Sequence, residues 1–150
     1  MIEDNHKKRS LGKLISHISR NIHWLIQHEL ENTGVGSGQY FFLHLVSRYP
    51  GITQNEISIK TDIDKATAAK GIAKLEHMGY LRRVPDQRDR RVRRLFLTPA
   101  GEAVMPEINS TLRKVTKVCA SDLTDKELDE LFHLLDKVGA SLAGYIKDNS

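Results

Sequence analysis

Residues 53–78 restrict the fold most, because they contain two short helical segments joined by a connection of only three or four residues. Thr53 and Glu56 have the spacing of a capping box, so a helix is expected to begin there. That helix must end before Asp64, which is a good N-cap for the second helix, and Gly79 is expected to terminate the second. Two short helices joined in this way predict a helix-turn-helix.

The second of these helices has two different faces. One face carries Ala68, Ile72 and Leu75, and Gly71 beside them allows close packing. The opposite face is small and basic, with alanine, threonine and lysine side chains. The apolar face is therefore expected to join the core and the basic face to meet solvent or a partner.

A β-hairpin is expected directly after the second helix. Residues 80–84 and 92–97 have the composition of strands and flank a polar turn at 85–91. The stretch from Arg82 to Arg94 holds seven arginines against two aspartates, and residues 51–101 carry a net charge of +5. Such a cluster indicates a polyanion contact or a solvated hairpin, and arginine favours the polyanion because it suits phosphate and groove contacts.

Long amphipathic segments lie on both sides of this basic module. Residues 10–30, 98–120 and 124–146 carry Ile, Leu and Val at three- and four-residue steps. One chain can pack these helices on each other, but near-heptad spacing at both ends of the chain favours an intertwined homodimer. The expected fold is mainly α with a small β-hairpin wing (α+β). The expected domains are a helical dimerisation region of residues 1–34 and 102–150 and a winged helix-turn-helix domain of residues 35–101.

The composition excludes several other classes of protein. With 150 residues, 39% of them hydrophobic, the chain suffices for one core-bearing domain or two small ones. Cys119 is the single cysteine and cannot form a disulfide within the chain, and no apolar run approaches the ~20 residues of a membrane span, so a cytoplasmic protein is expected. The seven histidines are scattered, and there is no glycine-rich phosphate loop or nucleophile elbow. We therefore expect no enzyme, no metal site and no cofactor.

Several short groups of residues occur in a defined order and spacing. They are Gly51-Ile52-Thr53-Gln54, Asp64-Lys65-Ala66-Thr67, Leu75-Glu76 with Gly79-Tyr80-Leu81, Asp86 with Asp89-Arg90-Arg91, and Leu97-Thr98 with Gly101. Together they resemble the multiple-antibiotic-resistance regulator (MarR) family over about residues 8–147. The resemblance implies a transcription regulator whose terminal helices interlock in a homodimer and whose two winged modules bind a pseudo-palindromic operator in double-stranded DNA. Two-fold symmetry implies half-sites roughly 10 base pairs apart.

The two helices of the helix-turn-helix supply the first group of expected DNA contacts. In the second helix, Lys70 is expected to read guanine through O6 and N7, and Lys74 to contact phosphate. Ala66 and Ala69 offer methyl groups to thymine, or simply favour helix formation on an outer face. The N–H groups at the start of the first helix suit a phosphate. The helix residues expected at DNA are Thr53, Gln54, Lys65, Ala66, Thr67, Ala69, Lys70 and Lys74.

The wing supplies the second group, which consists of Arg88, Asp89, Arg90 and Arg91. Asp89 and Arg91 stand where the family's wing motif has its aspartate and its minor-groove arginine. The resemblance therefore implies that a carboxylate holds the Arg91 guanidinium in one pose for a narrow minor groove. Arg82, Arg83 and Arg94 on the strands are expected to be solvated or ion-paired, so replacing Arg83 should cost little DNA affinity.

The resemblance also implies regulation, most simply as a repressor released by a small molecule. Many relatives bind small phenolic or aromatic anions near a region that holds Trp24, Tyr40, Phe41 and His44 here, although such aromatic residues more often form core or interface. Cys119 lies on or beside an apolar stripe and is expected to be a buried structural thiol rather than a sensor.

An alternative function is a winged-helix module that binds protein or RNA without reading DNA sequence. The small and basic outer face of the helix at 64–78 argues against it, because a protein interface favours aromatic anchors.

Overall fold

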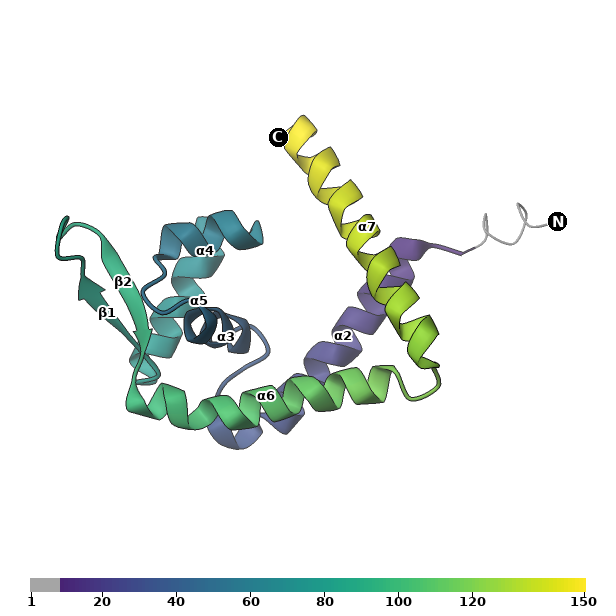
Figure 1. Ribbon diagram of the computed structural model, residues 1–150, viewed down its shortest axis with the longest axis horizontal. Helices are drawn as coiled ribbons and strands as arrows, with labels where there is room; N and C mark the ends of the chain where they lie inside the picture. Colours follow the sequence, from purple (N-terminus) through teal and green to yellow (C-terminus); the bar gives the residue numbers. More distant parts are fainter. Residues whose placement is uncertain (1–8) are drawn as a thin grey trace. The chain divides into compact units, whose positions relative to one another are not determined.

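The computed structural model describes residues 9–150. Residues 1–8, which include His6 and the start of the expected dimerisation region, lie outside the described part. Figure 1 shows helices and one two-stranded hairpin, so the expected mainly α fold with a β-hairpin wing is confirmed. The elements in chain order are α2 (Leu11–Glu29), the 3-10 helix η1 (Glu31–Thr33), α3 (Tyr40–Arg48), α4 (Gln54–Thr61), α5 (Lys65–His77), β1 (Leu81–Pro85), β2 (Arg93–Leu97), α6 (Pro99–Cys119) and α7 (Asp125–Asn149).

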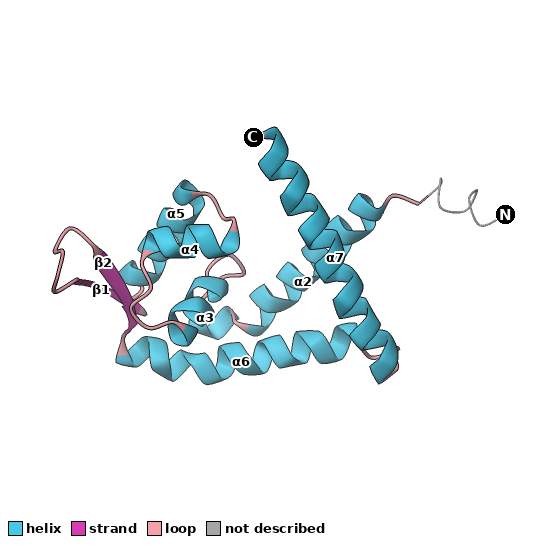
Figure 2. Cartoon of the chain, turned by 45° about the horizontal axis from the view of Figure 1, so that its top comes forward, coloured by secondary structure: helices cyan, strands magenta, loops and turns pink. Residues whose placement is uncertain are grey.

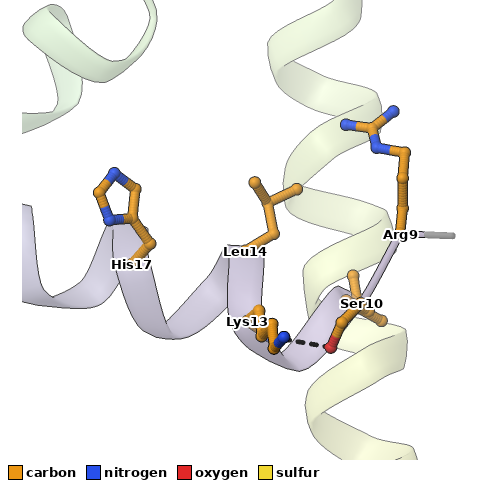
Figure 3. A pocket seen from close by; sticks show the side chains of 6 residues that line it. Arg9, Ser10, Lys13, Leu14 and His17 are labelled. Atoms are coloured by element: carbon orange, nitrogen blue, oxygen red, sulfur yellow. Dashed lines mark hydrogen bonds between the residues drawn. The ribbon is translucent and has the colours of Figure 1, made fainter.

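The chain forms two compact units, one that ends at Arg113 and one that runs from Lys114 to Ser150. The first unit begins with α2, where the Ser10 hydroxyl accepts the Lys13 N–H at 3.2 Å and so caps the helix. Figure 3 shows this cap at a surface hollow that His17 also lines.

The helices α4 and α5 start and end where the sequence predicts. The Thr53 hydroxyl accepts the Glu56 N–H at 3.2 Å, and the Glu56 carboxylate accepts the Thr53 N–H at 2.8 Å, which completes the capping box. Asp62 ends α4 in the left-handed conformation, with φ of 54°. Asp64 caps α5, and Gly79 follows that helix with φ of 78°, a conformation that favours glycine.

The hairpin is joined to the chain that precedes α4. In the antiparallel pair, Pro85 lies opposite Arg93, so Pro85 belongs to the first strand and not to the turn where it was expected. Proline is tolerated at the end of an edge strand. On the other edge of β2, the Gly51 N–H donates to the Leu95 carbonyl at 2.8 Å and the Leu95 N–H donates to the Ile52 carbonyl at 3.0 Å. These bonds fix the start of α4 to the wing. Figures 1 and 2 show the segment before α4 running beside β2.

The core of the first unit lies between α3, α5 and the hairpin. Ile72, Leu75 and Leu95 are fully buried there, and Phe42 is 2% exposed. A Cβ on Gly71 would lie 2.4 Å from the Phe42 ring, so only glycine allows this approach of α5 to α3. The close packing that the sequence predicts at Gly71 is confirmed.

The long helices expose many apolar side chains. In the second unit, α7 opens with a capping box between Thr124 and Glu127, as predicted, and buries none of its side chains. Cys119 is also exposed, so the prediction of a buried thiol is wrong for the described chain. The reason is that no element of the described chain covers the apolar stripe at the end of α6, where Val118 is 52% exposed. No helix within residues 9–150 is long and apolar enough to cross a membrane. The large apolar side chains exposed on α2 and α7 include Leu11, Leu14, Ile18, Leu131, Phe132, Leu134, Leu135, Leu142, Tyr145 and Ile146.

Candidate nucleic-acid interface

The start of α5 is organised by Asp64. Its Oδ1 accepts the Thr67 N–H at 2.8 Å, and its Oδ2 accepts the Thr67 hydroxyl at 2.6 Å. The hydroxyl bond and then the N–H bond hold the pKa of Asp64 below its usual value, so the carboxylate is ionised at neutral pH. Thr67 is exposed, yet its side chain is held in one orientation at the first turn of the helix.

The rest of the predicted contact face of α5 is accessible. Ala68, Ile72 and Leu75 turn toward the core, as predicted. Ala69 is half-buried and offers less surface than an outer-face position would. The side chains exposed on the rest of the helix include those of Lys65, Ala66, Thr67, Lys70, Ala73 and Lys74. The structure therefore keeps a small and basic surface available along α5.

The start of α4 is less open than the sequence predicts. The Glu56 carboxylate accepts the Thr53 N–H and also the Thr53 hydroxyl at 3.1 Å, so both donors of this residue are used inside the protein. The Thr53 N–H bond is the main reason why the pKa of Glu56 is lowered. A phosphate at this helix end would therefore meet the donors of Gln54 and Asn55 rather than those of Thr53.

Arg83 links three elements of the winged module. From β1, its Nε donates to the Glu76 carboxylate on α5, and its Nη2 donates to the Gln54 Oε1 on α4 at 3.1 Å. Of the two states expected for Arg83, solvated or ion-paired, the structure has the ion pair, and the Arg83 side chain is 29% exposed. The bond to Gln54 was not expected, because the two residues are 29 positions apart and no local pattern connects them.

Arg91 and Asp89 form a forked ion pair in the turn of the hairpin. Asp89 Oδ1 accepts the Arg91 backbone N–H and its Nε at 3.0 Å each, and Oδ2 accepts Nη2 at 3.0 Å. The pair lowers the pKa of Asp89 and raises that of Arg91, so both groups are charged at neutral pH. The Arg91 side chain is 91% exposed, and the two side-chain bonds fix its orientation while leaving further N–H donors for a partner.

A second ion pair holds the base of the wing. Asp86 accepts the Arg88 N–H at 2.7 Å and pairs with the Arg94 guanidinium, whose Nη1 donates to the Gly51 carbonyl at 3.0 Å. The Arg88 N–H bond is the main cause of the lowered pKa of Asp86. Sequence reasoning expected Arg94 to be solvated or ion-paired and did not predict the role of Asp86. The signal was present, because Asp86 and Arg94 flank the turn with opposite charges.

The remaining wing arginines Arg88, Arg90 and Arg93 are exposed, and the Arg82 guanidinium lies 5.1 Å from the centre of the Phe96 ring. Within residues 9–150, no group of three His, Cys, Asp or Glu side chains is arranged to hold a metal ion. The surface therefore presents positive charge and hydrogen-bond donors, namely the oriented guanidinium of Arg91 on the wing and the basic face of α5. Both suit a polyanion.

Comparison with known proteins agrees with this geometry. The model of the MarR family matches residues 33–92. The chain is also 30% identical, over 124 residues, to the uncharacterized HTH-type transcriptional regulator YybA of Bacillus subtilis (strain 168). The matched region covers 83% of this chain and 83% of YybA. The chain belongs to the MarR family. It is an HTH-type, DNA-binding transcriptional regulator and not an enzyme.

Solved structures of MarR family proteins share the fold. A MarR transcriptional regulator from Methanosarcina mazei Go1 is 32% identical, covers 90% of this chain and 97% of its own, and has a TM-score of 0.81. A mutant MarR from E. coli, crystallised with operator DNA, is 23% identical, covers 85% of this chain and 92% of its own, and has a TM-score of 0.78. The resemblance seen in the sequence motifs is thus confirmed at the level of family and fold.

Proposed function

We propose that this MarR family regulator is a homodimeric repressor that occupies a pseudo-palindromic operator in the cytoplasm. The observation that carries the proposal is the Arg91 side chain, which is 91% exposed and yet oriented by Asp89. An exposed surface arginine ordinarily samples many rotamers, and ordering it on binding costs free energy. An arginine that is already oriented loses less entropy when it enters a narrow minor groove, where the negative potential attracts it.

The proposed contacts come from α4, α5 and the wing. The first turns of α5 enter the major groove, where base edges are distinguishable, and Lys70 donates to guanine. Arg91 enters the adjacent minor groove. The E. coli relative, which has the same fold, was crystallised with operator DNA, and this supports DNA as the partner. The side chains proposed to contact phosphate or the sugar backbone are Gln54, Lys65, Lys74, Arg88 and Arg90.

The homodimer is supported by the apolar side chains that the single chain leaves exposed. Leu11 is 58% exposed on α2, and Leu142 and Ile146 are 58% and 62% exposed on α7. Exposed apolar patches of this kind in helices from both ends of a chain are typical of an interface. We therefore assign residues 1–34 and 102–150 to dimerisation and residues 35–101 to DNA binding.

Release by a small aromatic or phenolic effector is the remaining part of the proposal. Trp24 is 67% exposed and stacks on His28 with ring centres 5.3 Å apart, so it offers a flat face to a planar ligand. The Nδ1 atom of His44 is buried without a hydrogen-bond partner in the described chain, and in the tautomer that carries a proton on Nδ1 it would have an N–H free to donate to an anion. The effector proposal is tested by adding a phenolic acid to the complex of the protein with labelled operator DNA. The acid should displace the DNA from the wild-type protein but not from Trp24→Ala.

The wing assignment is tested with two single-charge variants. Arg91→Ala removes the oriented arginine, and Arg48→Ala removes the same charge from the end of α3. Fluorescence anisotropy with DNA from upstream of the protein's own gene should show a dissociation constant raised about 5- to 150-fold for Arg91→Ala and little change for Arg48→Ala.

Equal losses in the two variants would overturn the wing assignment, because a general loss of positive charge would then explain both. Light scattering on the same samples tests the homodimer. A mass of one chain at the concentrations that saturate DNA would contradict it.

A further inference from the structure

The hydroxyl hydrogen of Thr67 is committed inside the protein. The Thr67 hydroxyl oxygen and the Asp64 Oδ2 lie 2.6 Å apart, which requires one hydrogen between them. An ionised carboxylate has no hydrogen to give, and the lowered pKa of Asp64 keeps it ionised at neutral pH. The hydrogen therefore belongs to Thr67, and Asp64 is the acceptor.

What Thr67 can still offer to DNA follows from this bond. A threonine hydroxyl carries one hydrogen and two lone pairs, so Thr67 presents an acceptor and a methyl group but no donor. A phosphate oxygen is itself an acceptor, and the charge of Asp64 beside Thr67 repels it. The DNA backbone is therefore an unsuitable partner. The amino group of a base edge is a suitable one.

We propose that Thr67 determines specificity by selecting an amino base, adenine or cytosine, on the strand that it contacts, and by rejecting guanine and thymine there. The inference rests on the proposed binding of α5 in the major groove. Adenine N6 and cytosine N4 are donors at the major-groove edge, whereas guanine O6 and thymine O4 are acceptors. The Thr67 hydroxyl oxygen, whose hydrogen is donated to Asp64, would face guanine O6 or thymine O4 with one lone pair opposite another, and the two oxygens would repel each other.

Lys70 complements this reading. It lies three positions after Thr67, on the same side of α5, and its ammonium group is a donor without acceptor capacity. The helix therefore presents an acceptor and a donor in a fixed order along one face. A sequence motif read by this face should have an amino base where Thr67 contacts it and guanine where Lys70 does.

The test is selection of binding sites from duplexes with a randomised core by the full-length protein, in parallel with two variants. Thr67→Val keeps the shape of the side chain and removes its oxygen. Asp64→Ser keeps an N-cap oxygen for the Thr67 N–H but removes the carboxylate, so the hydroxyl hydrogen of Thr67 is released. Thermal unfolding followed by circular dichroism establishes that both variants are folded.

The expected result concerns one position in each half-site. Wild type should require adenine or cytosine there, Thr67→Val should accept all four bases, and Asp64→Ser should admit guanine or thymine. Thr67→Val should also bind the wild-type site about threefold to tenfold more weakly. The other positions of the motif serve as internal control and should not change.

Two outcomes would overturn the inference while the proposed function stands. In the first, the wild-type motif has guanine or thymine at the position where Thr67→Val loses its base preference. In the second, Thr67→Val loses its base preference at no position of the motif. A wild-type selection that yields no motif would instead overturn the proposed function, and the inference with it.

Discussion

Gly71→Ala is expected to destabilise the winged module although it adds only one methyl group. The new Cβ would lie 2.4 Å from Cε2 and 2.8 Å from Cδ2 of Phe42. Carbon atoms normally approach to about 3.5–4.0 Å, so the ring or α5 must move by roughly 1 Å or more. The ring has little room, because Phe42 is 2% exposed. Overpacking a core costs about 1–3 kcal/mol, and contacts as short as these place the cost in the upper part of that range, at about 2–3 kcal/mol. Replacing a helical glycine by alanine returns about 1 kcal/mol.

The net expectation is a loss of about 1–2 kcal/mol in the free energy of unfolding, measured by urea denaturation. Gly38→Ala is the control within the same winged module. Its φ is not positive, and beyond its chain neighbours a Cβ there meets no atom of the described chain within 4 Å, so it should gain up to about 1 kcal/mol. Because the displaced helix carries the proposed base contacts, Gly71→Ala should also weaken operator binding. A Gly71→Ala protein as stable as wild type would refute the packing argument.

Two further predictions follow from the side-chain network. Arg83→Ala should weaken operator binding, contrary to the expectation from sequence, because Gln54 loses the bond that orients its amide. When Gln54 is already replaced by alanine, Arg83→Ala should cause no further loss of operator affinity. An undiminished loss in that background would contradict the proposal that Arg83 acts through Gln54. The free energy of unfolding should fall as the pH drops below about 4.3. A carboxyl group whose pKa is lowered in the folded state stabilises the fold fully at a pH above its unfolded-state pKa. That stabilisation is lost as the pH falls through the folded-state pKa. Glu56 is such a group, so Glu56→Gln should lose less stability in acid, and an unchanged pH profile would exclude Glu56 as a contributor.

The sequence predicts the local structure of this protein well, because its strongest signals are local. Capping boxes at Thr53 and Thr124, the N-cap at Asp64 and the glycine at 79 each depend on residues within one helical turn, and the structure has all four. The pairing of Asp89 with Arg91 spans two residues and could likewise be expected from the motif.

Contacts between distant residues could not be predicted in the same way. The bond from Arg83 to Gln54 depends on how β1 packs beside α4, and no periodicity reports that packing. Cys119 was misjudged for a related reason: an apolar stripe shows that a face needs a partner, but not whether that partner belongs to the same chain. The donor and acceptor roles at Thr67 required the distance to Asp64.

Sequence-specific binding by the wild-type protein is the central claim, and one comparison of affinities tests it most directly. Fluorescence anisotropy at about 150 mM salt compares DNA from upstream of the protein's own gene with a scrambled duplex of equal length and composition. We predict a preference of about a hundredfold or more for the upstream duplex. Equal and weak binding to both duplexes, falling in parallel as salt is added, would contradict the claim that this protein reads an operator.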